Sequence, residues 1–273
     1  MPKSHLPEDG DLWLGSLCLS GRRVSAWMDP DIPVAWVTDG LVTGAGAIWR
    51  AMSAMTAETG LQPVLLASSN WGFEEAFRKP GDLTELGQMD AAAILAGLWD
   101  QRAVEVVDGR PLEPGDALYD PTLAAQYQPF SRTFPGMAPG TDGQLAPAVV
   151  SRALDSLPPA HVGLVAASRS ADVPAVTGWR ATGFWDSALP VSAVLRSWEA
   201  RFGARLLQLG PGAVIWLLVE RPPRSIRAAQ AVAAELWAFC DAMADEHGSF
   251  SLVTVSEIAA HVPEAPVWGF WWD

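Results

Sequence analysis

The clearest hydrophobic periodicity lies in the second half of the chain. After Pro190, apolar residues recur at i, i+3, i+4, i+7 and i+11, which predicts a helix that ends at Gly203. The residues of this apolar stripe are Val191, Val194, Leu195, Trp198 and Phe202. Two apolar runs follow, at 205–209 and 213–219, and the short Gly-Pro-Gly loop between them predicts an antiparallel hairpin.

The rest of this half predicts a sheet closed by helices. Residues 161–167 are a continuous apolar run, which indicates a buried strand. A helical pattern starts at the capping residue Ser225 and is expected to reach His247 before Gly248 stops it. The last segment, Val267–Asp273, places Trp268, Phe270 and Trp272 on one face of a strand and Trp271 on the other. Apolar residues on both faces predict a strand buried between layers.

The first half has weaker patterns. The opening thirty residues are rich in Gly, Pro and Asp and are interpreted as loop, with a short strand at Leu12–Leu19. Strands are predicted at 33–38 and 63–67, with a helix at 44–59 between them. A right-handed crossover would make these two strands parallel. Another helix is predicted from Asp90 through Val106.

A long stretch rich in proline and glycine, residues 108–147, separates the two halves. It is too long for an ordinary connector, so it is interpreted as either a linker or a covering lid, and its aromatic residues indicate that it packs on something. We therefore expect an N-terminal α/β region at 1–147 and a C-terminal α+β domain at 148–273. The whole chain is predicted to be α+β, with a mixed sheet and helices packed against it.

Composition narrows the classes of function. The chain is 49% hydrophobic and 18% charged, with a net charge of −13. A negative surface repels phosphate backbones and anionic lipids, so we expect no nucleic-acid partner and no membrane partner. Cys18 and Cys240 lie far apart and outside any CxxC spacing, the start of the chain has no apolar signal region, and a cytoplasmic location is expected.

No catalytic or metal-binding motif stands out. The chain has four histidines and lacks HExxH, CxxC, GxSxG and the P-loop pattern, so neither a metal nor a cofactor is expected. Gly44-Ala45-Gly46 resembles the start of a dinucleotide fingerprint, but Trp49 stands where the third glycine would be. Asp241 and Asp245 lie at the end of the expected long helix; a cation site there is weighed against solvated surface acids.

Six residues are candidates for binding a ligand or partner: Arg196, Glu199, Arg201, Trp179, Glu235 and Cys240. The first three share the polar side of the 190–203 helix, where an Arg196–Glu199 ion pair at i,i+3 is the simpler interpretation. The sequence assigns no catalytic role to any of the six.

Three motifs carry a family resemblance. Residues 190–205, 233–240 and 268–273 resemble, in this order, the bacterial family known as domain of unknown function 4253, whose members are common in actinobacteria. The resemblance covers roughly residues 161–273. The sequence departs from the family pattern after Gly178-Trp179 and after Phe239-Cys240. The resemblance implies an α+β fold and no particular activity.

Three functions are therefore compared. The first is a binding or protein-interaction domain that regulates or neutralises a partner. The second is an enzyme with an unfamiliar carboxylate and arginine site between the two halves. The third is a small-molecule binder with a tryptophan-lined pocket under residues 108–147. A pocket holding Glu235 or His161 would favour the second or third function, and an exposed apolar patch would favour the first.

Overall fold

The chain is described by a computed structural model over residues 5–14, 17–67, 76–103, 106–107, 110–112, 115–116, 121–180, 186–210, 214–240, 243–244 and 251–272. The strands are β1 Gly10–Leu14, β2 Leu17–Ala26, β3 Asp29–Thr38, β4 Leu61–Leu66, β5 Val106–Val107, β6 Arg110–Pro111, β7 His161–Ala166, β8 Ala204–Gly210, β9 Val214–Val219, β10 Met243–Ala244, β11 Ser251–Leu252 and β12 Val267–Trp271. The helices are α1 Ala45–Ala54, α2 Thr56–Thr59, α3 Leu83–Leu86, α4 Ala91–Ala103, α5 Pro121–Gln126, α6 Pro147–Asp155, α7 Val173–Thr177, α8 Leu189–Phe202, α9 Ile226–Phe239 and α10 Val255–His261, with a short 3₁₀ turn at Ser170–Asp172.

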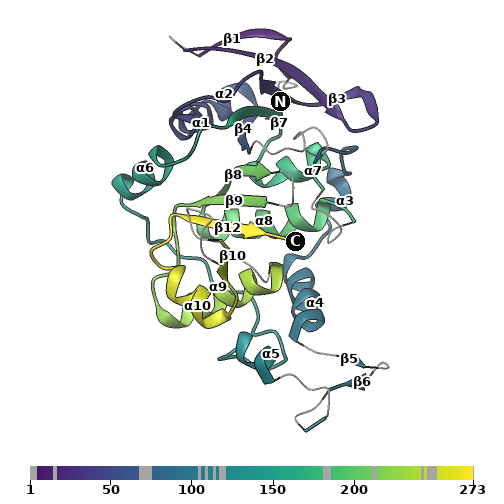
Figure 1. Cartoon of the computed structure of the whole chain (residues 1–273), viewed down its shortest axis with the longest axis vertical. Helices are drawn as coiled ribbons and strands as arrows, with labels where there is room; N and C mark the ends of the chain where they lie inside the picture. Colours follow the sequence, from purple (N-terminus) through teal and green to yellow (C-terminus); the bar gives the residue numbers. More distant parts are fainter. Residues whose placement is uncertain are drawn as a thin grey trace.

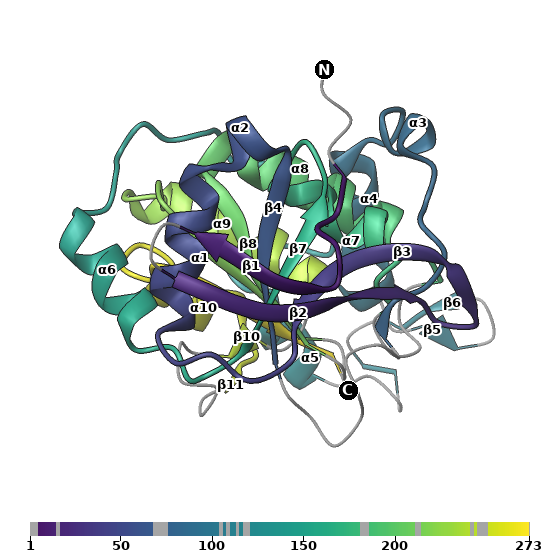
Figure 2. The same cartoon turned by 90° about the horizontal axis from the view of Figure 1, so that it is seen from above.

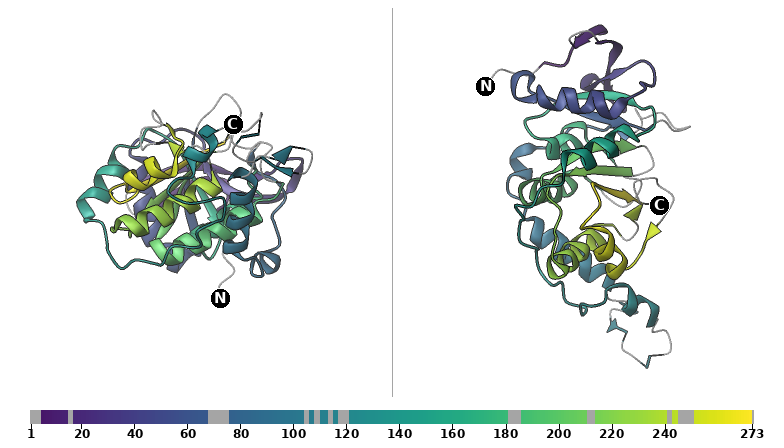
Figure 3. Two further views of the ribbon diagram at one scale, coloured as in Figure 1. Left: turned by 90° about the horizontal axis from the view of Figure 1, so that it is seen from below. Right: turned by 90° about the vertical axis from the view of Figure 1, so that its left-hand side faces the viewer.

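A mixed sheet extends from β1, at the top of the molecule in Figure 1, down to β12 and β10, and α5 lies beyond it. Within the described residues it has ten strands, in the order β1-β2-β3-β7-β4-β8-β9-β12-β10-β11. Its neighbouring pairs are antiparallel, except for the parallel pair β4 and β8. Strands β1–β3 lie at one end of the elongated molecule, and α5 with β5 and β6 at the other (Figure 3, right). The prediction of an α+β protein with a mixed sheet is confirmed.

Helices cover both faces of the sheet. Alternating side chains explain this: Leu65 joins a core cluster with α1 and α6, whereas Val64 and Leu66 join the larger cluster with α4, α8 and α9. The larger cluster holds most of the buried aromatic rings. Seen from above, α1 and α6 lie on one side of the strands, with α8 and α9 farther back (Figure 2). None of the described helices is both long and apolar enough to cross a bilayer.

The prediction of a mostly loop-like start is wrong. Strands β1, β2 and β3 form an antiparallel meander at the sheet edge. Gly21 was interpreted as a loop residue, but it lies inside β2, where the ring of Trp36 covers it. A Cβ at this position would lie 2.5 Å from that ring. Glycine is required at position 21 because the ring of Trp36 lies against the backbone, and not because the chain turns there. The glycine content of the first thirty residues therefore did not indicate a loop at this position.

The strand–helix–strand unit forms, with one unexpected neighbour. Strands β3 and β4 are both antiparallel to β7, so they run parallel to each other as predicted. They are not adjacent, because β7 of the second half lies between them. The two halves of the sequence therefore share one continuous sheet.

The two glycines at the start of α1, Gly44 and Gly46, shape the turn before the helix and its contact with α6. Gly44 precedes the helix with φ 66°, in the left-handed region that glycine adopts without strain. A Cβ at Gly46 would lie 2.1 Å from the backbone oxygen of Leu154 in α6. The Gly-Ala-Gly motif therefore lets two helices approach, and Trp49 lies buried on the same helix.

The long helix of the second half ends earlier than predicted. Helix α9 stops at Phe239, and Cys240 has extended backbone angles. Met243 then pairs with Phe270 of β12, so the chain adds a strand to the sheet. The sequence after Cys240 has good helix formers and no glycine or proline until Gly248, so the local sequence does not account for the end of the helix at Phe239. Asp241, Asp245 and His247 lie outside the described residues.

The last strand is interior to the sheet, between β9 and β10. Trp268, Phe270 and Trp272 are buried in the larger core cluster, as predicted. Burial on both faces was also predicted, and this is wrong at Trp271, which is 45% exposed. On the other face only Val267, at the start of the strand, reaches the smaller cluster.

The proline-rich stretch packs on the core from residue 121 onward. Tyr127, Phe130 and Phe134 place their ring centroids 5.8–6.3 Å from the ring of Trp99. Trp99 in turn contacts Trp237 of α9 at 5.0 Å. These rings fill the space beneath this part of the segment, as its aromatic content predicts.

Candidate functional site

A small pocket lies between residues 78–81 on one side and residues 178–180 and 186–188 on the other. We call it the cation pocket, because three positive side chains among the described residues line it: Arg78, Lys79 and Arg180. Its volume is about 150 Å³. The other described residues of its lining are Gly81, Gly178, Trp179, Asp186, Ser187 and Ala188.

The backbone holds the two walls of the cation pocket against each other. The N–H of Arg78 donates to the oxygen of Thr177 at 3.1 Å, and the N–H of Arg180 donates to the oxygen of Ala76 at 2.9 Å. The N–H of Gly81 donates to Ala175 at 2.9 Å. Three backbone hydrogen bonds therefore fix where the cationic side chains begin.

Gly178 makes this close approach possible. It ends α7 with φ 59°, and a Cβ there would lie 2.4 Å from the backbone oxygen of Lys79 and 2.5 Å from that of Arg78. Both the left-handed backbone and the contact distance require glycine. The turn at Gly178 therefore brings Arg180 to the same pocket as Lys79.

The charge of the cation pocket is opposite to that of the chain as a whole. The described part of its lining has three cations and one carboxylate, Asp186, whereas the chain carries a net charge of −13. Lys79 and Arg180 are exposed at the pocket. Arg78 is half-buried: it donates to the oxygen of Phe77 at 3.0 Å and lies 6.0 Å from the ring centroid of Trp27. Such a pocket attracts a small anion.

Of the six candidates from the sequence, the structure places one in this pocket. Trp179 lines it, although its indole is buried and donates to the oxygen of Gly210 at 3.3 Å. The ring also contacts Trp272 at 6.3 Å. Trp179 therefore forms the floor, and the cations form the rim.

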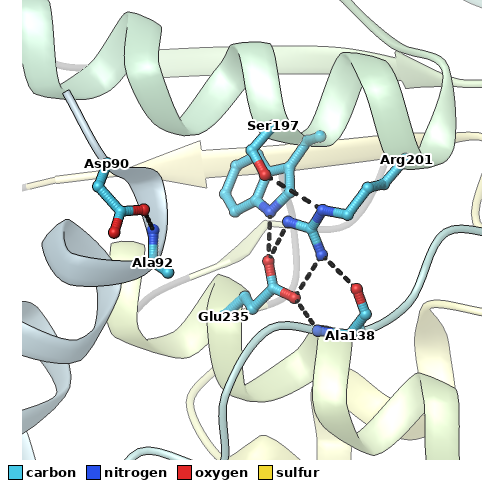
Figure 4. A network of polar contacts seen from close by, with 7 residues as sticks. Asp90, Ala92, Ala138, Ser197, Arg201 and Glu235 are labelled. Carbon is cyan, nitrogen blue, oxygen red and sulfur yellow. Dashed lines mark hydrogen bonds and ion pairs between the residues drawn. The ribbon is translucent and has the colours of Figure 1, made fainter. Parts of the chain in front are cut away.

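Glu235 and Arg201 form a buried ion pair instead (Figure 4). The guanidinium of Arg201 binds both carboxylate oxygens, at 2.7 and 2.5 Å. The indole N–H of Trp198 and the backbone N–H of Ala138 donate to the same carboxylate, at 2.9 and 2.7 Å. Arg201 also donates to the oxygen of Ala138 at 2.8 Å and to Ser197 at 3.1 Å.

This network joins three segments of the chain. Trp198 and Arg201 come from α8, Glu235 comes from α9, and Ala138 belongs to the proline-rich stretch (Figure 4). Glu235 is fully buried, and four protein hydrogen bonds occupy its carboxylate. General acid or base chemistry would need an oxygen that reaches a substrate. The geometry therefore favours a structural role for this pair.

The expected Arg196–Glu199 pair does not form among the described residues. Arg196 binds the buried Asp172 at 2.5 Å, and Glu199 binds Arg169 at 2.7 Å. Both partners belong to the turn before α7, which lies against α8. Arg196 and Glu199 therefore each bind a residue of another segment in place of each other. The backbone of that segment positions its charged side chains, so these ion pairs are better oriented than a pair between two flexible side chains on one helix.

Neither cysteine has the surroundings of a nucleophile. Cys240 is buried, and its thiol donates to the oxygen of Trp271 at 3.2 Å. Cys18 is exposed in β2, and desolvation followed by the negative charge of Asp11 raises the pKa of its thiol. A raised pKa lowers the population of the reactive thiolate. Cys18 and Cys240 do not form a disulfide with each other, in agreement with their separation in the sequence.

Sequence reasoning missed the residues of the cation pocket. Arg78 and Lys79 lie about 100 positions before Arg180, so no local motif connects them. One signal was present: Lys79 is one of two lysines in the chain, and it lies next to Pro80-Gly81.

The fold defines an α+β protein with a mixed sheet, and comparison with known proteins adds one match. Residues 161–273 match the model of a family described as a domain of unknown function (DUF4253). This region starts at β7 and includes Gly178, Trp179 and Arg180, but not Arg78 or Lys79. No curated protein matches the chain, and no solved structure matches it either.

Proposed function

We propose that this protein binds a small anionic molecule in the cation pocket. One observation carries the proposal: Arg78, Lys79 and Arg180 surround a single hollow, on two backbone segments that are hydrogen-bonded to each other. Exposed cations in an acidic chain would otherwise be expected to lie near surface carboxylates. Preorganised cations bind an anion without the entropic cost of ordering a loop.

The size of the cation pocket restricts the ligand. A volume of about 150 Å³ is smaller than the roughly 300–1,000 Å³ of pockets that enclose drug-sized ligands. The pocket therefore suits a phosphate, a sulfate or a short carboxylate, or one such group at the end of a larger molecule. Ser187 and Asp186 add a hydroxyl and a carboxylate that can accept hydrogen bonds from the remainder of that ligand.

The test is calorimetric titration with inorganic phosphate, sulfate and citrate at low ionic strength. We expect at least one anion to bind, and we expect Lys79→Ala and Arg180→Ala each to weaken its affinity about tenfold, as the loss of one charge-assisted contact does. Arg227→Ala is the matched control, because Arg227 is exposed on α9 and lies outside the pocket lining. It removes the same charge and should leave the affinity unchanged.

Two results would contradict the proposal. Equal loss of affinity in all three variants would show a general effect of net charge. Absence of heat with every anion at millimolar concentration would remove the proposed ligand class altogether.

Docking of a protein partner is the second candidate function, and the tip of the β2–β3 hairpin favours it. Met28 is 90% exposed and has φ 65°, and its neighbour Trp27 is 44% exposed. A large apolar residue in the left-handed region at full exposure has no benefit for folding. Met28→Gly should preserve or raise stability, because glycine adopts this backbone without strain.

The same variant tests the docking role. If the tip contacts a partner, a protein that co-purifies with the wild-type chain in equal amount should be absent from the Met28→Gly preparation. Recovery of that protein with both chains would eliminate the hairpin tip as its contact. Thermal unfolding of the purified variant checks that the fold is intact.

A further inference from the structure

The first described residues form a strap across the edge of the sheet. We use this name for residues 5–9, which lie against β2 and β3 and are held mainly by Arg23. The Nε of Arg23 donates to the oxygen of Pro7 at 2.8 Å, and its Nη2 donates to the oxygen of Leu6 at 3.0 Å. The same Nη2 lies 2.8 Å from the carboxylate of Glu8.

Two further hydrogen bonds fix the strap. The backbone N–H of Arg23 donates to the carboxylate of Asp9 at 2.7 Å, and the indole N–H of Trp36 donates to the oxygen of Glu8 at 3.1 Å. These two bonds do not involve the guanidinium. The strap therefore stays anchored at its inner end even if the contacts of the Arg23 side chain change.

A hollow of about 320 Å³ lies beneath this strap, and we call it the strap hollow. Part of its lining is apolar and comes from separate parts of the fold: Pro33 and Val34 of β3, Pro80, Ala166 of β7 and Val176 of α7. Arg23, Leu6 and His5 lie at its edge. It falls at the lower end of the size range of small-molecule sites, about 300–1,000 Å³.

Only two of the three nitrogens of the Arg23 guanidinium bind described residues. Its Nε and Nη2 hold the strap, whereas its Nη1 makes no hydrogen bond with any described residue. A positioned guanidinium beside a partly apolar hollow can recognise a carboxylate attached to an apolar body. The apolar side chains of the lining would contact that body and remove part of its surface from water.

We propose that the strap hollow binds a small molecule with an apolar body and one carboxylate, which Arg23 holds through Nη1. The strap hollow and the cation pocket share no lining residue in the part of the chain that the structure describes, so this proposal is independent of the proposed function. Glu8 competes for the same guanidinium in the free protein. Its carboxylate is mostly exposed, so a ligand can replace it at little cost.

The probe for this proposal is 4-phenylbutyrate, with its uncharged amide as the ligand control, in calorimetric titrations of the full chain. The wild-type protein should bind the carboxylate and bind the amide at least tenfold more weakly. Arg23→Ala should reduce the affinity for the carboxylate about tenfold. Glu8→Ala should raise it a few-fold, because the competing carboxylate is gone while the oxygen of Glu8 still binds Trp36.

A third variant keeps the test valid if Arg23→Ala loosens the strap. Val176→Phe fills the strap hollow from α7 and leaves Arg23 and the strap in place, and it should abolish binding of the probe. The proposal is overturned if the amide binds as well as the carboxylate, if Val176→Phe binds normally, or if the wild-type chain gives no heat at millimolar probe. Unchanged affinity in Glu8→Ala would contradict the assigned competition at Arg23.

Discussion

Replacing Glu235 with alanine is expected to lower the free energy of unfolding by about 3–5 kcal/mol. The variant would leave the positive charge of Arg201 without its carboxylate partner and beside a cavity. The N–H groups of Trp198 and Ala138 would also lose their hydrogen-bond acceptor. Breaking one side of a buried ion pair typically has a cost of this size. Urea unfolding, followed by tryptophan fluorescence, measures the change.

Two variants make this prediction specific. Glu199→Ala removes another ion pair of α8, but that pair, with Arg169, is partly exposed, so the loss should be below about 1 kcal/mol. The double variant Glu235→Leu with Arg201→Met replaces the pair by apolar side chains and should recover much of the stability. A loss below 1 kcal/mol for Glu235→Ala would show that the network contributes little.

The second large effect concerns two adjacent tryptophans at the end of the chain. Trp272 is 3% exposed, its ring contacts Phe239 at 5.2 Å and Phe270 at 6.1 Å, and its indole N–H donates to the oxygen of Phe239. Trp272→Ala should therefore cost about 3–5 kcal/mol, the usual range for a buried aromatic residue.

Trp271→Ala is the matched control for this prediction. The two residues are neighbours of the same type, but Trp271 is 45% exposed, so its loss should remain below about 1 kcal/mol. Chemical denaturation of both variants gives the comparison. Equal losses would mean that β12 is stabilised by its backbone pairing with β9 and β10, and not by the rings on its inner face.

Regular periodicity predicted the second half of the fold well. The stripe from Val191 to Phe202 became α8, and the Gly-Pro-Gly loop joined β8 to β9 in an antiparallel pair. In these segments the local pattern and the tertiary contacts agree. The wrong predictions fall where the local pattern and the tertiary contacts differ. The glycine-rich start indicated a loop, but Gly21 lies in a strand against the ring of Trp36. The residues after Cys240 favoured a helix, but Met243 and Ala244 pair with β12.

The candidate sites were harder to predict, for a physical reason. Glu235 and Arg201 were both candidates from the sequence, but nothing in the sequence paired them: they are 34 residues apart and bind each other. The cation pocket and the strap hollow both depend on contacts between distant segments, such as Arg78 with Thr177. A single sequence records no such pairing, since the contact is between a backbone oxygen, which every residue has, and a backbone N–H, which every residue except proline has.

The position of β7 has a consequence for how the chain acquires its structure during synthesis. Strands β3 and β4 are complete by residue 66, yet the strand that fills the space between them starts at residue 161. One of the bonds that closes this space joins His161 to Thr38 across 123 residues. Sheets built from such distant pairings fold slowly, because a long loop must be closed first. A nascent chain that ends before β7 would hold two parallel strands with unpaired edges, and would depend on the ribosome or a chaperone to keep them from other chains.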